Sequence, residues 1–491
     1  MGVDFNYIAA WVLPLLAGSG VWAALHGGVR NRSDLAGAIG AGWLIGVFVA
    51  AQCARWTAQV DTAHAFAHAW PWVAAIGTVA WIVAVVRMRK ASVRFAFAER
   101  ELVPSNGARW LRGLWWILLL LIVTRLLVIG DEASMRPVFP WDAWSAWSIK
   151  AKAWFMAGRV EPYVPMLDWL ADPSAAVRTA GAWSYPELLA WIQLWFASAI
   201  GAWNEPLVDL AWCGALSAFA LAAYGYWRAF ALSPWISLGL VYALVSLPLI
   251  DAHVALAGYA DLWVAITLGL AVLAWTRWLI LRERGQWVLA VALALCLPAI
   301  KLEGTVWLVA FLAVIALDRV PDRRRLRVTL AAALVLGVVA FVGLLYAFGV
   351  FRLVTGGVEI PSLGLFELGW HSVGGAMVAS LFTLPNWHLL WYLVPVLLIL
   401  RWRRLREDRA AGLLGLLLLI DAAFLFVLFF LTGAGAWAQD FTSANRLILQ
   451  IVPSVFALAS VLLRGCNGAV AESTPARRDT ARERVPPNVA V

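Results

Sequence analysis

Two residues of types suited to chemistry lie where polar segments meet apolar ones. Arg446 begins an apolar run that continues to Leu463, so its guanidinium is expected at the membrane boundary. A planar, permanently charged fork at that depth can bind phosphate oxygens bidentately, although a simple interfacial anchor would also explain the residue. Asp142 begins a segment with helical spacing, where its carboxylate could act as a general base or could only cap the helix.

Further candidate side chains lie in the same kinds of polar segment. Lys150 and Lys152 follow Asp142 on the helical segment and could serve only as interfacial cations. Asp131 and Glu132 form an acidic pair before Asp142. The remaining candidates are Tyr185, Glu187, His253, Tyr259, Asp261, Lys301 and Glu303. Because no two of the four cysteines have metal-site spacing and residues 130–205 lack an Asp-x-Asp motif, we expect no metal ion and no other cofactor.

The composition indicates that membrane helices position these residues. Apolar and aromatic residues make up 63% of the 491 residues, and only 14% are charged. A soluble protein of this length has about a quarter of its residues charged, so a soluble enzyme, a disordered scaffold and a nucleic-acid binder are excluded. Long apolar stretches separated by short Arg-rich loops predict an all-α polytopic membrane protein.

Apolar runs predict about 13 transmembrane helices. They lie near residues 6–25, 35–52, 70–86, 113–129, 206–227, 234–250, 261–278, 287–300, 304–317, 328–349, 387–400, 411–431 and 446–463. A further run at 186–202 is ambiguous. If it does not cross, most of the 38 Lys and Arg residues lie on one side, as the positive-inside bias requires. We therefore expect a helix at 186–202 that lies in the outer interface or re-enters from it, an external N-terminus and a cytoplasmic tail.

This topology divides the chain into three regions. Residues 1–112 form an N-terminal three-helix membrane extension, and residues 464–491, rich in Arg, Pro, Ala and Glu, are expected to be a disordered cytoplasmic tail. Residues 113–463 carry the candidate site, including an amphipathic external loop at 130–205 after the fourth span. The cytoplasmic loops contain little except arginine, so any chemistry should face the other side of the membrane.

The candidate residues lie in several short motifs whose order along the chain resembles that of the GT-C superfamily of glycosyltransferases. The most similar group is that of the protein O-mannosyltransferases and lipid A aminoarabinose transferases. The resemblance covers roughly residues 113–463. It rests on Asp142 before an amphipathic helix, Tyr185-Pro186-Glu187, the segment from His253 to Asp261, Lys301-Leu302-Glu303-Gly304, and Arg446 with Pro453. One departure is Ser184, which stands where relatives in the aminoarabinose group tend to have a basic residue before the proline.

The resemblance implies a membrane glycosyltransferase with a GT-C fold and an inverting mechanism. Such an enzyme moves a sugar from a polyprenyl-phosphate donor to a glycan, lipid or protein acceptor, here on the periplasmic side of a bacterial inner membrane. Membrane lipids are further partners, and no nucleic acid is expected. The absence of a Gly-rich phosphate loop fits a lipid-linked donor.

The resemblance also assigns roles to the candidate residues. Asp142 and Asp261 match the first and second catalytic acidic positions, and Asp131 and Glu132 are rivals for the first. The cations stabilise the departing phosphate. Substrate-binding roles fall to Asp131, Glu132, Lys150, Lys152, Tyr185, Glu187, His253, Tyr259, Lys301, Glu303 and Arg446.

Two other functions compete with a transferase. Asp421 lies midway along an apolar run, where a charge costs at least 2–3 kcal/mol, and it could be the proton or substrate site of a secondary transporter or a lipid-glycan flippase. However, a transporter places its ionisable residues near the midplane, and most candidates here lie at the ends of spans. A non-catalytic subunit that retains the fold is the third interpretation.

Overall fold

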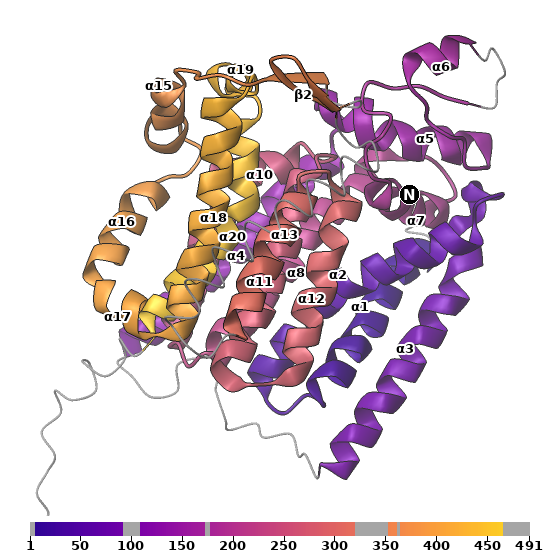
Figure 1. Ribbon diagram of the computed structural model, residues 1–491. Coiled ribbons are helices and arrows are strands. Elements are labelled where there is room, and N and C mark those ends of the chain that lie inside the picture. Colours follow the sequence, from indigo (N-terminus) through magenta and orange to yellow (C-terminus); the bar gives the residue numbers. More distant parts are fainter. Residues whose placement is uncertain (1–4, 92–108, 172–176, 320–351, 361–363, 465–491) are drawn as a thin grey trace, which may run out of the picture.

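A computed structural model of the chain describes residues 5–91, 109–171, 177–319, 352–360 and 364–464. The described part is predominantly helical, and its helices run between two ends of a bundle (Figure 1). We call the end that carries α5, α6 and the small β-sheet the loop-rich end; it is uppermost in Figure 1. The chain is an all-α polytopic membrane protein, because at least eight described helices are long and apolar enough to cross a bilayer.

The eight candidate spans are α1 (Phe5–His26), α2 (Arg32–Thr57), α3 (Ala65–Lys90, preceded by the short helix η1, Thr62–His64), α4 (Arg109–Ser134), α8 (Glu205–Ala229), α11 (Asp261–Leu281), α18 (Arg409–Leu431) and α20 (Ala444–Leu463). A ninth would consist of α9 (Pro234–Val245) and α10 (Pro248–Ala255), which are bent by 60° at their junction. Shorter apolar helices include α12 (Arg284–Ile300), α13 (Gly304–Asp318) and α16 (Leu390–Leu400). The expected span at 328–349 lies outside the described residues, and a count of about 13 stays a prediction.

The remaining described elements lie mainly in the connections. They are η2 (Ala143–Trp147), α5 (Ser148–Ala157), α6 (Met166–Ala171), α7 (Leu188–Ile200), α15 (Gly374–Val378), η3 (Ala379–Thr383), α17 (Trp402–Glu407) and α19 (Gly435–Gln439). Three strands, β1 (Arg352–Val354), β2 (Gly357–Ile360) and β3 (Gly364–Glu367), form an antiparallel meander in which Val358 pairs with Leu353 and Phe366. The sequence did not predict this sheet.

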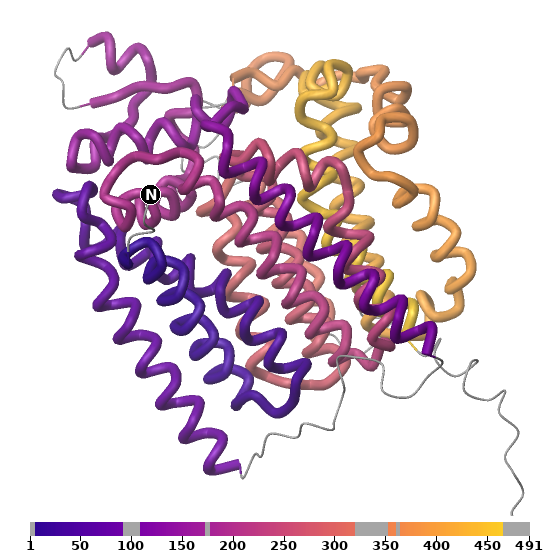
Figure 2. Tube along the Cα trace, turned by 180° about the vertical axis from the view of Figure 1, so that it is seen from behind, coloured from indigo at the N-terminus to yellow at the C-terminus, as the bar shows by residue number. Residues whose placement is uncertain are grey.

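Close contact between α1 and α2 depends on glycine. A Cβ atom on Gly18 would lie 1.8 Å from the carbonyl oxygen of Gly42, and one on Gly46 would lie 1.8 Å from that of Pro14. Small residues of this kind let membrane helices approach at backbone distance. α2 then packs against α8, and α1 packs against α12. α3 lies beside both α1 and α2 (Figure 2).

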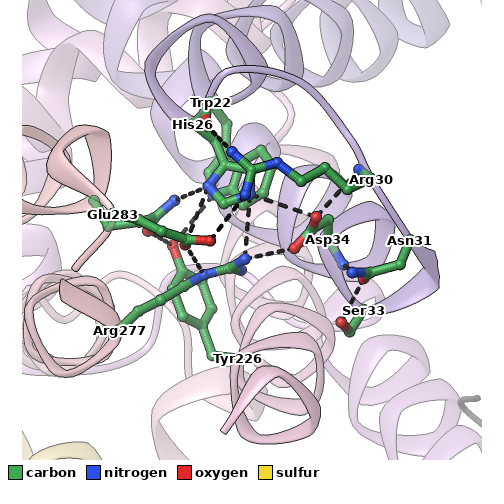
Figure 3. Close-up of polar contacts among 10 residues, drawn as sticks. Trp22, His26, Arg30, Asn31, Ser33, Asp34, Tyr226, Arg277 and Glu283 are labelled. Atoms are coloured by element: carbon green, nitrogen blue, oxygen red, sulfur yellow. Dashed lines mark hydrogen bonds and ion pairs between the residues drawn. The ribbon is translucent and has the colours of Figure 1, made fainter. Parts of the chain in front are cut away.

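A buried polar cluster joins these N-terminal helices to the rest of the bundle (Figure 3). Arg277 of α11 donates to Asp34 of α2 and to Glu283, at 2.5 Å in each case, and its guanidinium also lies 3.2 Å from the His26 ring. Because Arg277 and Asp34 are almost completely buried, their charges must be compensated by each other. The cluster therefore fixes α2 against α11 at the end opposite the loop-rich end.

Helix α7, within the ambiguous run at 186–202, lies inside the protein and not on its surface. Most of its residues are buried, and it packs between α5 and the N-terminal helices α1, α2 and α3. Its 13 residues span about 20 Å, less than the thickness of a hydrocarbon core. The N-terminal helices cover the apolar face that a helix on the surface would turn towards lipid, and the position of this helix relative to the membrane interface stays a prediction.

The orientation prediction can be tested by labelling with an impermeant thiol reagent in intact cells. In a variant without the four native cysteines, Asp168→Cys in α6 should be labelled from outside, and Glu407→Cys in α17 should react only after the membrane is permeabilised. The two positions lie at opposite ends of the bundle (Figure 1). If Glu407→Cys is labelled in intact cells and Asp168→Cys is not, the orientation is reversed.

Candidate active site

The strongest candidates from sequence meet at the loop-rich end. Asp142 immediately precedes η2, Asp261 is the first residue of α11, and Lys301 follows the last residue of α12. Arg446 lies in the first turn of α20, which packs along α11. Helix ends that are far apart in sequence thus place two carboxylates and two cations in one region.

Asp142 and Arg446 form an ion pair across this region. The Nη1 atom of Arg446 donates to Oδ2 of Asp142, and its Nε atom donates to the Thr442 carbonyl at 2.9 Å. The guanidinium also lies 5.0 Å from the centre of the Tyr259 ring, within range of a cation–π interaction. The Asp142 side chain makes no capping hydrogen bond to η2, so its contact is with Arg446 and not with the backbone of the helix that it precedes.

The ion pair is only partly enclosed. The Arg446 side chain is 15% exposed and the Asp142 side chain is 39% exposed. A carboxylate with this access could meet a substrate, whereas the less exposed guanidinium lies in a drier environment that strengthens its attraction for anions. Asp142 is therefore accessible to a substrate, and Arg446 supplies the positive charge that would bind an anion.

A second, buried ion pair lies between α11 and the loop after α12. Lys301 Nζ donates to Asp261 Oδ1 at 2.9 Å and lies 3.1 Å from Glu303 Oε1. Burial alone would lower the pKa of Lys301, but the charges of Asp261 and Glu303 outweigh it and raise the pKa above its usual value. Lys301 therefore stays charged, and its charge is fixed beside Asp261.

Gln450 also contacts this second ion pair, although it was not among the residues predicted from the sequence. Its Nε2 atom donates to Asp261 Oδ1 at 2.6 Å, and its Oε1 atom accepts from the indole of Trp307. The signal was present in the sequence, because Gln450 follows Arg446 by one helical turn and so shares its face of α20. One face of this helix thus contacts both candidate carboxylates.

Several hydrogen-bonding atoms near the second pair are buried without a partner in the described part of the chain. They are Oδ2 of Asp261, Oε2 of Glu303 and Nε2 of His253. His253 Nδ1 lies 2.8 Å from the Leu249 carbonyl, which can only accept, so Nδ1 is assigned the proton and Nε2 is an acceptor. All three atoms are buried acceptors, so a substrate hydroxyl reaches them only when the side chains that cover them move.

Aromatic rings connect Lys301 to the loop before α7. The Lys301 Nζ atom lies 5.9 Å from the centre of the Trp147 ring, which stacks on Tyr185 at 5.4 Å. Burial is the main cause that raises the pKa of the Tyr185 hydroxyl, so this group stays protonated and can act as a hydrogen-bond donor. The pKa of Tyr259 is also raised, again mainly by burial.

The two lysines of α5 have structural partners. Lys150 is buried and donates to the carbonyl oxygens of Trp183 at 2.8 Å and Tyr185 at 2.6 Å. Burial lowers its pKa to about 8. Because its ammonium contacts backbone carbonyls inside the protein, Lys150 does not extend to the membrane interface as an anchoring cation would. Lys152 is exposed and pairs with Glu205 at 2.8 Å. Lys150 therefore holds the backbone that carries Tyr185.

The other acidic candidates are not brought to the Asp142–Arg446 pair. Asp131 is exposed near the end of α4, and Glu132 pairs at 2.8 Å with Arg136, which lies just beyond the end of this helix. Glu187 precedes α7 without a capping hydrogen bond. Among the residues that the structure describes, no group of three or more His, Cys, Asp or Glu side chains could hold a metal ion.

Asp421 lies apart from these residues, within the apolar span α18. Its side chain is buried, and both carboxylate oxygens lack a partner in the described ranges. An isolated carboxylate in this position costs free energy, and such residues within membrane spans commonly mark functional sites.

Comparison of the chain with protein-family models, with curated proteins and with solved structures found no match. Function must therefore be argued from the site. It combines a partly exposed carboxylate, two fixed cations and a set of unpaired hydrogen-bond acceptors at one end of a membrane-spanning bundle.

Proposed function

We propose that the protein is an integral membrane glycosyltransferase of the GT-C type, which moves a sugar from a polyprenyl-phosphate donor to an acceptor hydroxyl or amine. The observation that carries the proposal is the contact between Asp142 and Arg446 at the boundary of the spans. General-base transfer from a phosphate leaving group needs a carboxylate and a cation within one substrate length of each other. The acidic and basic residues that the GT-C resemblance selected from separate segments meet in this arrangement.

Each group has a defined task in the proposed reaction. The acceptor oxygen or nitrogen forms a bond to the anomeric carbon while the bond from that carbon to the phosphate oxygen breaks. The electron pair of the broken bond passes to the phosphate, whose charge Arg446 stabilises, and Asp142 takes the proton of the acceptor. Attack opposite the leaving group inverts the anomeric configuration.

In the proposed complex, the side chains that cover the buried pair move and the sugar contacts its free acceptor atoms. Oδ2 of Asp261, Oε2 of Glu303 and Nε2 of His253 accept hydrogen bonds from sugar hydroxyls, which would satisfy acceptors that otherwise lack a partner. Lys301 and Gln450 fix the orientation of the Asp261 carboxylate. We place the site on the periplasmic face of a bacterial inner membrane, following the orientation predicted by the arginine bias.

Mass spectrometry of lipids that co-purify with the protein would identify the donor class directly. A polyprenyl phosphate linked to a sugar is expected in the wild type. Transfer is then measured with that lipid after reconstitution, using cell-envelope glycans, lipids and proteins as acceptors.

Removal of the proposed phosphate ligand should weaken donor binding. We expect Arg446→Ala to lose most transfer through weaker donor binding, and Arg446→Lys to retain part of it, because an ammonium keeps the charge but loses the bidentate fork. Arg178→Ala is the matched control, since Arg178 is exposed and pairs with Glu161 at 2.7 Å. Full activity and unchanged donor affinity in Arg446→Ala would show that Arg446 is only an anchor.

A secondary transporter or flippase is the alternative that one observation favours, namely the unpartnered Asp421 within α18. This alternative predicts that Asp421→Asn abolishes substrate movement across the membrane. The transferase predicts that the same variant keeps transfer activity, because Asp421 belongs to neither ion pair. Measurement of both activities in Asp421→Asn separates the two functions.

A further inference from the structure

The ion pair between Asp142 and Arg446 places two groups with different tasks in direct contact. Arg446 uses Nε for the Thr442 carbonyl and Nη1 for Asp142, and Nη2 lies 3.4 Å from the Ser443 hydroxyl. The Tyr259 ring lies against the guanidinium at 5.0 Å. These contacts use three of the five N–H groups, so a phosphate bound to the two that remain, one on Nη1 and one on Nη2, would share the guanidinium with Asp142.

The contact also affects the carboxylate. Oδ2 of Asp142 accepts the hydrogen bond from Arg446, so this oxygen has less capacity left to accept a hydrogen bond from an acceptor group. A phosphate on the same guanidinium would repel the carboxylate, because two anions would then share one cation. With 39% of its side chain exposed, Asp142 has room to turn away from Arg446.

We propose that the donor phosphate and Asp142 compete for Arg446, so that donor binding releases the carboxylate that serves as the base. This inference rests on the proposed function and specifies the order in which donor binding and acceptor activation occur. Asp142 becomes available to the acceptor only after the donor has occupied the guanidinium. The acceptor is thus activated only when a sugar donor is already bound.

Lys301 does not offer the same exchange. Its ammonium is buried and is already bound to Asp261 and Glu303, so a phosphate there would have to separate a pair that is 4% and 0% exposed. Such a separation leaves a buried carboxylate without its cation, which is strongly unfavourable. Arg446, with 15% of its side chain exposed, is the cation that an incoming phosphate can reach.

The competition predicts that loss of the base strengthens donor binding. The probe is undecaprenyl phosphate without a sugar, bound to the full-length protein in nanodiscs. We expect Asp142→Asn to bind this lipid about 3- to 10-fold more tightly than the wild type, because the phosphate no longer displaces a carboxylate. The control is Asp168→Asn, which removes an exposed carboxylate from α6, and it should leave the affinity unchanged.

A double-mutant cycle separates local competition from a general change in charge. In an Arg446→Ala background, Asp142→Asn should have no effect on affinity, since the shared guanidinium is absent. A gain of the same size in both backgrounds, or equal or weaker binding by the single variant, would overturn the competition. If the wild type and every variant fail to bind the lipid, the proposed function fails with it. If the lipid binds well but the cycle shows no coupling, only the competition fails.

Discussion

Transfer by Asp142→Asn is expected to fall by about 10²- to 10⁴-fold, the usual contribution of a general base. The amide is nearly isosteric with the carboxylate, so the protein should fold and insert normally. The measurement is kcat for transfer, with donor affinity determined separately. Because the substitution should tighten donor binding while it lowers kcat, the two parameters are expected to change in opposite senses.

Asp131→Asn is the informative comparison for this experiment. Asp131 is exposed and lies outside the pair with Arg446. Near-normal transfer by Asp142→Asn together with an inactive Asp131→Asn would assign the base to the earlier acid. Loss of protein from the membrane fraction would instead indicate a folding defect, which size-exclusion chromatography in detergent detects.

Lys301→Met should have the largest effect on stability. The substitution leaves Asp261, which is fully buried, without its cation, and breaking a buried pair typically costs about 3–5 kcal/mol. We expect a large drop in the melting temperature and loss of transfer. The measurement is thermal unfolding in detergent, followed by transfer assays on the fraction that remains folded.

The double variant Lys301→Met/Asp261→Asn separates stability from function. Removal of both charges should recover much of the lost stability, because no isolated charge stays buried. Transfer should stay low, since the oriented carboxylate is absent. Recovery of both stability and transfer would mean that the pair has only a structural role and that Asp261 is not part of the site.

The helical architecture by itself is compatible with several functions, and only the two ion pairs distinguish among them. Helical bundles with charged residues at one end occur in transporters and in enzymes alike, so the fold does not select between them. The position of the ionisable groups does favour a transferase. They lie where helices end, and Asp421 is the exception among the described candidates.

The membrane-spanning elements were predictable from sequence because the bilayer imposes simple requirements. A spanning segment must satisfy its backbone hydrogen bonds internally and present about 20 apolar residues to lipid, and both requirements are visible in a linear sequence. α1, α2, α4, α8, α11, α18 and α20 therefore lie close to their expected ranges. The β-sheet was missed because strands of three or four residues carry too short an alternating pattern.

The sequence by itself determined which residues lie at the ends of the spans, because a charge is expensive inside the bilayer and tolerable at its boundary. It did not determine which ends meet. Asp142 and Arg446 are 304 positions apart, and although the spacing puts Gln450 on the same face of α20 as Arg446, it does not identify Asp261 as the partner of Gln450. Helices in a membrane associate through close packing of side chains and small residues, with no difference in polarity between partner and lipid to mark the contact. Only the tertiary structure could therefore decide that α20 places its polar face against α11 and the turn before η2.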